Sequence, residues 1–335
     1  MSHLPLPSCT HTTHDSSADI LLRALTIMAS EYYTFPPAGR WWLDEACRSD
    51  LLTMSVPRHV THVRMSKSLK FVPERLFYSH QNIEEVECHY GVTKIFRLAF
   101  GWCPSLRRVI IPGVRVIKDI AFCYCEAMTY VECGKLEIIG GEAFRKCRSL
   151  SGIDLPSIKI VEGDAFNGCR NLTYVKFGKD LESIGERAFL FCRSLQRIAI
   201  PLKDGIITND SVFTACKNLE RVDLVGGVHE TVAALLLEEW RNDMNEEIYA
   251  INQILPNTPA GGWDWINDEL DPGKKAQAIR TWLRKVLHKY IYYKAEHRRY
   301  VNEAAATLLR QDLPRDVVLK NILPFLTRML DPYDM

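Results

Sequence analysis

Residues 184–201 read IGERAFLFCRSLQRIAIP, and the centre of this stretch, Ala-Phe followed by Cys and Leu at intervals of three residues, recurs along the chain. A weaker copy, with His80 at the cysteine position, precedes six close copies. Self-similarity at a fixed period of this length is typical of a solenoid, in which each unit buries its apolar side only against its neighbours. The repeated residues are Phe100, Phe122, Phe144, Phe166, Phe189 and Phe213, with Cys103, Cys125, Cys147, Cys169, Cys192 and Cys216.

Each copy continues from its leucine into an alternating pattern, such as Leu-Arg-Arg-Val-Ile-Ile-Pro over residues 106–112. Side chains alternate across a strand, so Val109 and Ile111 point to one side while Arg108 and Ile110 point to the other. Proline lacks the donor that a strand ladder needs and therefore ends the strand. A second apolar pair and the Ala-Phe segment follow, and apolar groups three residues apart suit one turn of helix. We therefore expect a strand, a turn, a short strand and a helical turn in each unit.

The pattern Ile-Gly-x-x-Ala-Phe-x-x-Cys-x-x-Leu-x-x-Ile-x-Leu-Pro resembles the consensus of BspA-type leucine-rich repeats, and residues 184–201 match it almost position by position. The resemblance covers roughly residues 57–228, about half of the chain. It implies an α/β fold, a leucine-rich-repeat solenoid of about seven repeats of 22–24 residues, to which the remaining residues add a C-terminal helical domain. Such repeats serve adhesion, recognition and scaffolding, so the fold implies binding without naming a ligand.

The eleven cysteines could suggest a disulfide-rich chain, but six of them occupy one repeat position. In a stacked array they would form a column facing the core, where a free thiol behaves as a small apolar residue. Cys123 and Cys125 lack the partner spacing of a zinc site. We therefore expect the repeated phenylalanines and cysteines to form a structural ladder that requires neither a metal nor an oxidising compartment.

The pattern divides the chain into three regions. Residues 1–55 comprise a tail expected to be mobile and an apolar piece, starting at Trp41, that predicts a helix capping the open end of the array. The repeats occupy residues 56–228, and residues 229–335 have helical periodicity. The N-terminus lacks a cationic start followed by an apolar core, and no run of about 18 apolar residues occurs. We therefore expect an intracellular protein, cytoplasmic or nuclear, without a transmembrane segment.

Charge is sharply divided within the C-terminal region, which the pattern resolves into an acidic helix, a basic helix and a terminal helix. Residues 230–271 hold ten acidic groups against one arginine, and residues 274–299 hold nine basic groups against one glutamate. The basic helix, with its interleaved tyrosines, could bind nucleic acid or an anionic membrane surface. Alternatively, it lies antiparallel to the acidic helix on the last repeats, and the two charges compensate. We favour this pairing, and the net charge of +1 also argues against extensive nucleic-acid binding.

The terminal segment, residues 313–326, reads LPRDVVLKNILPFL and resembles the opening helix of an F-box. That resemblance would imply a substrate adaptor of a ubiquitin ligase. An F-box has several helices and usually precedes the repeats, whereas only nine residues follow Leu326. A simpler interpretation, which we favour, is an amphipathic terminal helix with Asp312 as its N-cap and Pro314 in its first turn.

Enzymatic signatures are weak in this sequence. The stretch Gly-Lys-Lys at residues 273–275 lacks the preceding glycine and the Ser/Thr of a phosphate-binding loop. His59 and His62 lie in a strand-like stretch and bring no other ligand with them. No nucleophile and base stand in a recognisable arrangement. We therefore expect a protein that is not an enzyme, with no catalytic residue, no cofactor and no metal.

A binding protein needs a surface, and strand positions that face away from the core are candidates. Residues two and four after each repeat Leu or Met would line a concave sheet. Tyrosine and arginine are enriched at interface hot spots, although sheet propensity and solubility favour them there too. We expect recognition or scaffolding of an unidentified protein, without nucleic acid and in an undetermined oligomeric state. The predicted protein-binding residues are Arg108, Tyr130, Glu132, Tyr174, Lys176, Arg197, Arg221 and Asp223.

Overall fold

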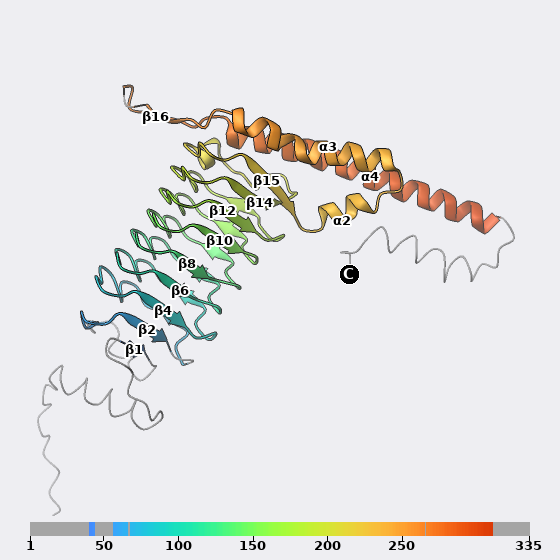
Figure 1. Cartoon of the computed structure of the whole chain (residues 1–335). Helices are drawn as coiled ribbons and strands as arrows, with labels where there is room; N and C mark the ends of the chain where they lie inside the picture. The colour runs from blue at the N-terminus through green and yellow to red at the C-terminus, as the bar shows by residue number, and fades with distance from the viewer. Residues whose placement is uncertain (1–39, 44–55, 66–67, 265, 311–335) are drawn as a thin grey trace, which may run out of the picture.

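The computed structural model describes residues 40–43, 56–65, 68–264 and 266–310, the first of these ranges as backbone only. The described chain is a stack of similar turns, and two helices lie side by side across its C-terminal end (Figure 1). The N-terminal tail and the F-box-like terminal segment lie outside the described residues.

Each turn contributes one strand to a row of parallel strands along one side of the stack (Figure 1). The register advances by one repeat at each step, so Arg108 pairs with Tyr130 and Arg197 with Arg221. Equivalent repeat positions therefore line up in columns. The strands form a five-stranded sheet, β1-β2-β4-β6-β8, and a four-stranded sheet, β10-β12-β14-β15. They are β1 (Arg40–Leu43), β2 (His62–Met65), β4 (Glu85–Cys88), β6 (Arg108–Ile110), β8 (Tyr130–Glu132), β10 (Gly152–Leu155), β12 (Tyr174–Phe177), β14 (Arg197–Pro201) and β15 (Arg221–Val225).

A second parallel sheet, of six two-residue strands, runs along another side of the stack. Its order is β13-β11-β9-β7-β5-β3, so each strand again pairs with those of the adjacent turns. An isolated bridge from Ile184 to Ile207 carries the pairing one turn further. The strands are β3 (Phe71–Val72), β5 (Lys94–Ile95), β7 (Val116–Ile117), β9 (Ile138–Ile139), β11 (Ile160–Val161) and β13 (Ser183–Ile184).

Phenylalanine rings form a continuous stack through the interior, from Phe77 to Phe213. Neighbouring ring centroids lie 4.8 to 5.7 Å apart, and the ring planes differ by 13° or less. Burying a large aromatic side chain contributes about 2–3 kcal/mol, and ring contacts add to it. The core is therefore one apolar column shared by all the repeats, as a solenoid requires.

The repeated cysteines lie beside this stack, and each thiol donates to a phenylalanine carbonyl of the preceding turn. The Sγ–O distances range from 3.0 to 3.2 Å, as in Cys103 to Phe77 and Cys147 to Phe122. Burial raises the pKa of the Cys103 thiol to about 12, so it remains a protonated donor at neutral pH. At the same repeat position, His80 Nε2 lies 3.0 Å from the Pro57 carbonyl oxygen. The described cysteines from Cys88 to Cys216 are all free thiols.

The Ala-Phe segments differ from the expected helical turn. Except in the last repeat, where a 3₁₀ helix η2 (Asp210–Phe213) forms, they are consecutive turns. In these repeats two residues, four apart, have positive φ, as at Leu98 (58°) and Trp102 (58°). Apolar groups three residues apart fit a helical turn and this double turn equally well. The two structures differ only in the residues with a left-handed backbone conformation.

The residues after the array form the helical end of the molecule. Helix α2 (Val228–Ala233) leads to α3 (Glu238–Ile254) and a 3₁₀ turn, η3 (Leu255–Asn257). A hairpin of β16 (Gly262–Asp264) and β17 (Glu269–Asp271) projects beyond the stack (Figure 1). Helix α4 (Lys275–Arg310) then returns antiparallel to α3 and also contacts η2.

The start of the predicted capping helix is a strand instead. Residues 40–43 form β1, which pairs in parallel with β2, so that Trp41 lies opposite Val63. Aromatic residues fit a pleated strand well, and β2 would otherwise leave an unpaired edge. The open end of the array is thus covered by an added strand, while residues 44–55 lie outside the described part.

Candidate functional site

The predicted binding residues occupy two columns on the outward side of the long sheets, which we call the sheet face. Along β6, β8, β12, β14 and β15, their neighbours in the strands point inward and are buried, as Val131 and Val175 show. Tyr130 and Tyr174 are 47% and 43% exposed to solvent, which is high for aromatic residues on a sheet. The structure thus places the residues in columns on one side, with Asp223 the most enclosed of the charged members.

At the centre of the sheet face, one tyrosine lies over a glycine. A Cβ added to Gly152 would come within 2.0 Å of a ring carbon of Tyr174, so the ring occupies the space that a side chain would need. The next column member, Tyr130, donates its hydroxyl to Glu132 at 3.2 Å. The Glu132 carboxylate raises the pKa of the Tyr130 phenol, which stays a neutral donor. The absence of a side chain at Gly152 therefore leaves room for the Tyr174 ring, and the hydrogen bond to Glu132 orients Tyr130.

The charged groups on both sides of this centre largely neutralise one another. Towards the N-terminus, Arg64 pairs with Glu87 at 2.6 Å, and Arg108 lies 3.7 Å from Glu85. Arg108 also stands 5.4 Å from the centroid of the Tyr130 ring, within the range of a cation–π contact. Exposed pairs of this kind contribute about 0–1 kcal/mol, so they shape the surface more than they stabilise it.

Towards the C-terminus, Arg197 and Arg221 share the carboxylate of Asp223. The Arg221 Nε–Asp223 Oδ1 distance is 3.0 Å, and Arg197 bonds the other oxygen. Between the two neutralised ends, Asp154 and Lys176 form no ion pair with any described residue. The centre of the sheet face therefore offers two tyrosines and three charges without ion-pair partners among the described residues, those of Glu132, Asp154 and Lys176.

The N-terminal part of the sheet face was not among the predicted residues. Glu85 and Glu87 belong to the same columns, because their strand pairs in register with β6. The same offset, counted from Ile83 of the weaker repeat copy, would have found both. Register likewise places His62 and Arg64 in the columns.

The basic residues of α4 are mostly engaged with carboxylates. Lys289 bonds Asp243 at 2.8 Å, Lys285 bonds Glu247 at 2.8 Å, and both carboxylates belong to α3. Arg280 and Arg284 pair with Asp210 and Asp204 of the last repeat. The antiparallel pairing on the last repeats, expected from the opposite charges, is thus the arrangement observed.

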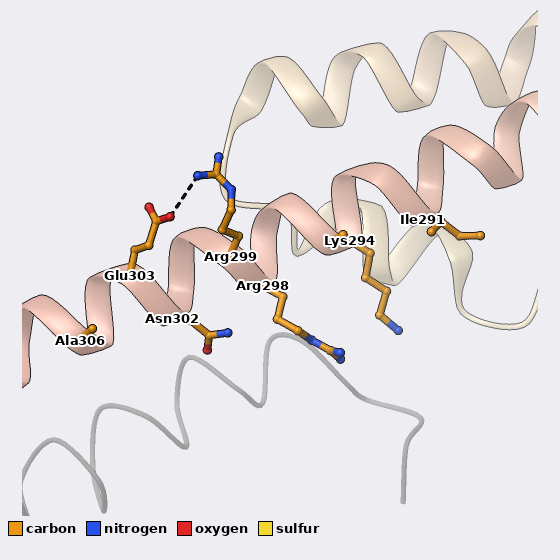
Figure 2. A pocket seen from close by; sticks show the side chains of 8 residues that line it. Ile291, Lys294, Arg298, Arg299, Asn302, Glu303 and Ala306 are labelled. Atoms are coloured by element: carbon orange, nitrogen blue, oxygen red, sulfur yellow. Dashed lines mark hydrogen bonds and ion pairs between the residues drawn. The ribbon is translucent and has the colours of Figure 1, made fainter.

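Beyond α3, one face of α4 has a hollow, which Figure 2 shows from close by. Within it, Arg299 forms an ion pair with Glu303 at 3.0 Å. Basic, amide and small apolar side chains alternate there, so the hollow lacks a single chemical character. Its lining comprises Ile291, Lys294, Ala295, Arg298, Arg299, Asn302, Glu303 and Ala306.

The described residues contain neither a metal-binding cluster nor a membrane-spanning helix. No group of three or more His, Cys, Asp or Glu side chains is placed to hold a metal ion within the described ranges. None of the described helices combines the length and the apolar character needed to cross a bilayer. His62 instead lies 3.8 Å from Glu85 on the sheet face.

The chain matches the BspA type leucine-rich repeat region in six copies, over residues 57–129 and 137–234. These residues make up just over half of the chain, which therefore belongs to the BspA-type leucine-rich-repeat family. No curated protein matches the chain.

Several solved structures are similar to part of the chain. The leucine-rich repeat protein of T. pallidum is 25% identical, with a TM-score of 0.37, over 50% of this chain and 74% of that one. A leucine-rich repeat protein from Bacteroides ovatus is 21% identical, with a TM-score of 0.28, over 50% and 61%. The pneumococcal vaccine antigen PcpA is 16% identical, with a TM-score of 0.30, over 57% and 67%. Because these TM-scores are low, the family assignment rests on the repeat match.

Proposed function

We propose that this protein recognises another protein through the sheet face, with the centre around Tyr130 and Tyr174 as the main contact. Proteins with BspA-type leucine-rich repeats are generally recognition proteins rather than enzymes, which supports a binding role. The observation that carries the proposal is the exposed pair of tyrosines around Gly152, because a rigid aromatic anchor loses little entropy on binding.

The chemistry of the centre indicates the kind of partner surface. Tyr130 and Tyr174 offer apolar rings with hydroxyl groups. Glu132 and Asp154 offer negative charge, and Lys176 offers positive charge. A partner that fits would present an apolar patch between a basic group and an acidic group. The surrounding arginines, Arg108 and Arg197, would form a polar rim, which affects the association rate and the specificity more than the affinity.

The test begins with a defined partner. Full-length chain carrying a photo-cross-linker at Lys176 would be used to identify the protein attached there, and calorimetry with that purified protein would follow. The double variant Tyr130→Ala/Tyr174→Ala should weaken binding at least tenfold, since truncating a hot spot costs about 2 kcal/mol or more. Arg170→Ala, at an exposed position after a repeat cysteine, is the matched control and should leave the affinity unchanged.

A second variant tests whether binding depends on the position of the Tyr174 ring and not only on its presence. Gly152→Ala keeps both tyrosines but must displace the Tyr174 ring, because the added methyl group would overlap it. We expect weaker binding with an unchanged unfolding midpoint. Equal affinity of the wild type, the double variant and Gly152→Ala would refute the sheet face as the recognition site.

A further inference from the structure

The β16–β17 hairpin presents apolar side chains to solvent at a fixed place beyond the array. Ile266, in the loop between the two strands, is 93% exposed, more than any other large apolar side chain among the described residues. Trp263, on β16, is 37% exposed. An aliphatic side chain held out in water in this way contributes nothing to the core, and exposed apolar groups at a protrusion mark contact sites.

The base of this hairpin is firmly attached to the last repeat. Ala215 N donates to Ala260 O at 2.7 Å, and Thr214 Oγ1 donates to Pro272 O at 3.0 Å. Gly261 and Gly273 have φ of +67° and +69°, and a Cβ on either would lie within 2.4 Å of backbone atoms. The point at which the hairpin leaves the array is therefore set by the last repeat.

The hairpin is also strongly acidic. Residues 258–273 contain four carboxylates and no basic side chain: Asp264, Asp268, Glu269 and Asp271. None of them forms an ion pair with a described residue. This acidic hairpin would be repelled by an anionic lipid surface, so a membrane does not fit it. It fits an apolar surface bordered by cations.

Such a surface exists on the same chain, on the turns of the first repeats. Tyr78 and Trp102 are 44% and 37% exposed, and the Trp102 ring stacks on Tyr124 at 4.8 Å. Arg75 lies 5.8 Å from the centroid of the Tyr78 ring, and Lys146 Nζ lies 2.7 Å from the Tyr124 hydroxyl. We call these five residues the aromatic edge.

The aromatic edge is complementary to the hairpin in charge as well as in polarity. Neither Arg75 nor Lys146 forms an ion pair with a described carboxylate. Both Trp102 and Tyr124 hold bulky side chains at positive φ, where glycine is favoured, and the same repeat position in a later turn is Gly168. The aromatic rings therefore stand at the turns on the surface, with the two cations beside them.

The hairpin cannot reach this edge within one molecule, because its base is bonded at Thr214, several turns away from Tyr124. We propose that the acidic hairpin of one copy docks on the aromatic edge of a second copy, with Ile266 against Trp102 and the carboxylates facing Arg75 and Lys146. The contact is head to tail, so it would propagate into short chains instead of closing a symmetric dimer.

The association is expected to be weak, because a hairpin tip covers little surface. Sedimentation velocity of the full chain, at concentrations up to about 0.5 mM, is suited to a contact that buries less than about 1,000 Å². The wild type should show a concentration-dependent increase in weight-average sedimentation coefficient that diminishes at high salt. A monomer over the whole range would overturn the proposal.

Charge reversal tests each surface separately. An edge variant, Arg75→Glu/Lys146→Glu, and a hairpin variant, Asp268→Lys/Glu269→Lys, should each lower the association constant at least tenfold. Mixed together, they should restore association as chains in which the two variants alternate, because the hairpin of each variant then faces an edge of opposite charge on the other. Association that survives either reversal, or no recovery on mixing, would show that these two surfaces do not meet.

Matched controls separate this contact from other causes. Asp154→Lys/Lys176→Glu reverses two charges on the sheet face and should leave self-association unchanged. Ile266→Ser keeps every charge and should still lower the association constant, since the apolar anchor is lost. The unfolding midpoints of all variants, by circular dichroism, should match the wild type, because the altered side chains lie on the surface. Association unaffected by Ile266→Ser would contradict the docking geometry.

Discussion

In the middle of the array, Phe144 lies between two other phenylalanine rings, and no charged side chain is buried between residues 81 and 210. At the C-terminal junction, by contrast, Lys275 is only 2% exposed and donates to the carbonyl oxygens of Leu219 and Leu255, at 2.5 and 3.0 Å. The middle of the array buries no charge, whereas the junction adds a buried charge and its hydrogen bonds to the apolar core. The two regions should therefore respond differently to mutation and to pH.

The largest effect is expected in the ring stack. Phe144→Ala removes contacts to Phe122 and Phe166 and leaves a cavity, which should lower the free energy of unfolding by about 3–5 kcal/mol. Urea denaturation followed by circular dichroism measures it. Tyr90→Ala, at a position that is 67% exposed, is the control and should change stability little. A loss below about 1 kcal/mol for Phe144→Ala would mean that the stack is not the main source of stability.

A smaller and more local effect is expected at the junction. Lys275→Met leaves the Leu219 carbonyl without its donor, whereas the Leu255 carbonyl keeps the hydrogen bond from Thr258 N. An unsatisfied buried acceptor costs about 1–3 kcal/mol. Hydrogen exchange should then accelerate in α3 and α4 while the array strands keep their protection. The exposed neighbour Lys274 supplies the control, Lys274→Met. Uniform acceleration throughout the chain would mean that array and junction unfold as one unit.

The thiol column offers a finer comparison within the array. Cys147→Ala removes the S–H donor of the Phe122 carbonyl, which lies 3.2 Å away. Cys123→Ala removes the same atom from a buried cysteine for which no such bond is found. The difference in unfolding free energy between the two variants should be about 0.5–1 kcal/mol, the contribution of a weak hydrogen bond. If both variants lost the same unfolding free energy, the cysteine column would contribute to stability through packing alone.

The smallest expected effect is a pH response confined to the junction. His297 is buried, and its Nδ1 accepts a hydrogen bond from Leu236 N at 3.1 Å, which requires that nitrogen to be unprotonated. Burial lowers the pKa of His297 below its usual value of 6.5. The unfolded chain therefore binds the proton more readily, so this stability is fully present above pH 6.5 and falls as the pH decreases through the window below it.

Hydrogen exchange of the Leu236 amide, corrected for its intrinsic rate, measures this response between neutral and mildly acidic pH. Protection should decrease on acidification, while the amide of Val175 in the array, treated in the same way, should not respond. In His297→Phe the pH dependence should disappear. A junction that loosens on acidification equally in that variant would trace the response to other groups, such as Asp243, whose pKa is lowered by its bonds to Lys289 and Tyr293.

The repeat architecture could be predicted because each copy places the same apolar residues at the same positions. A phenylalanine and a cysteine at fixed offsets have only one way to be buried in every unit, namely against their equivalents in the next turn. The helix pairing was predictable for a similar reason, since opposite charges on adjacent helices compensate. In both cases the prediction rests on many residues together, through the repeat period in the first case and the net charge of each helix in the second.

Features that depend on individual residues could not be predicted in this way. The left-handed turns fall at non-glycine residues such as Glu142 and Lys146, so composition gives no sign of them. The hairpin was not predicted, although Gly261 and Gly273 at its base and Asp268 at its turn are signals that could have been used. On the sheet face, the columns follow from the period. The overlap of Tyr174 with the space above Gly152 requires coordinates.

The left-handed corners have a consequence for engineering. In each turn of the solenoid the chain changes direction at residues in the left-handed backbone conformation, which is unfavourable for L-amino acids. One of these residues is the β-branched Ile120 (φ 59°), and Gly168 is the single glycine at these corners in the described turns. A side chain in this conformation costs roughly 1–2 kcal/mol. Added coils that carry glycine or asparagine at such corners would avoid that cost, so an artificially lengthened solenoid could tolerate higher temperatures than the natural one.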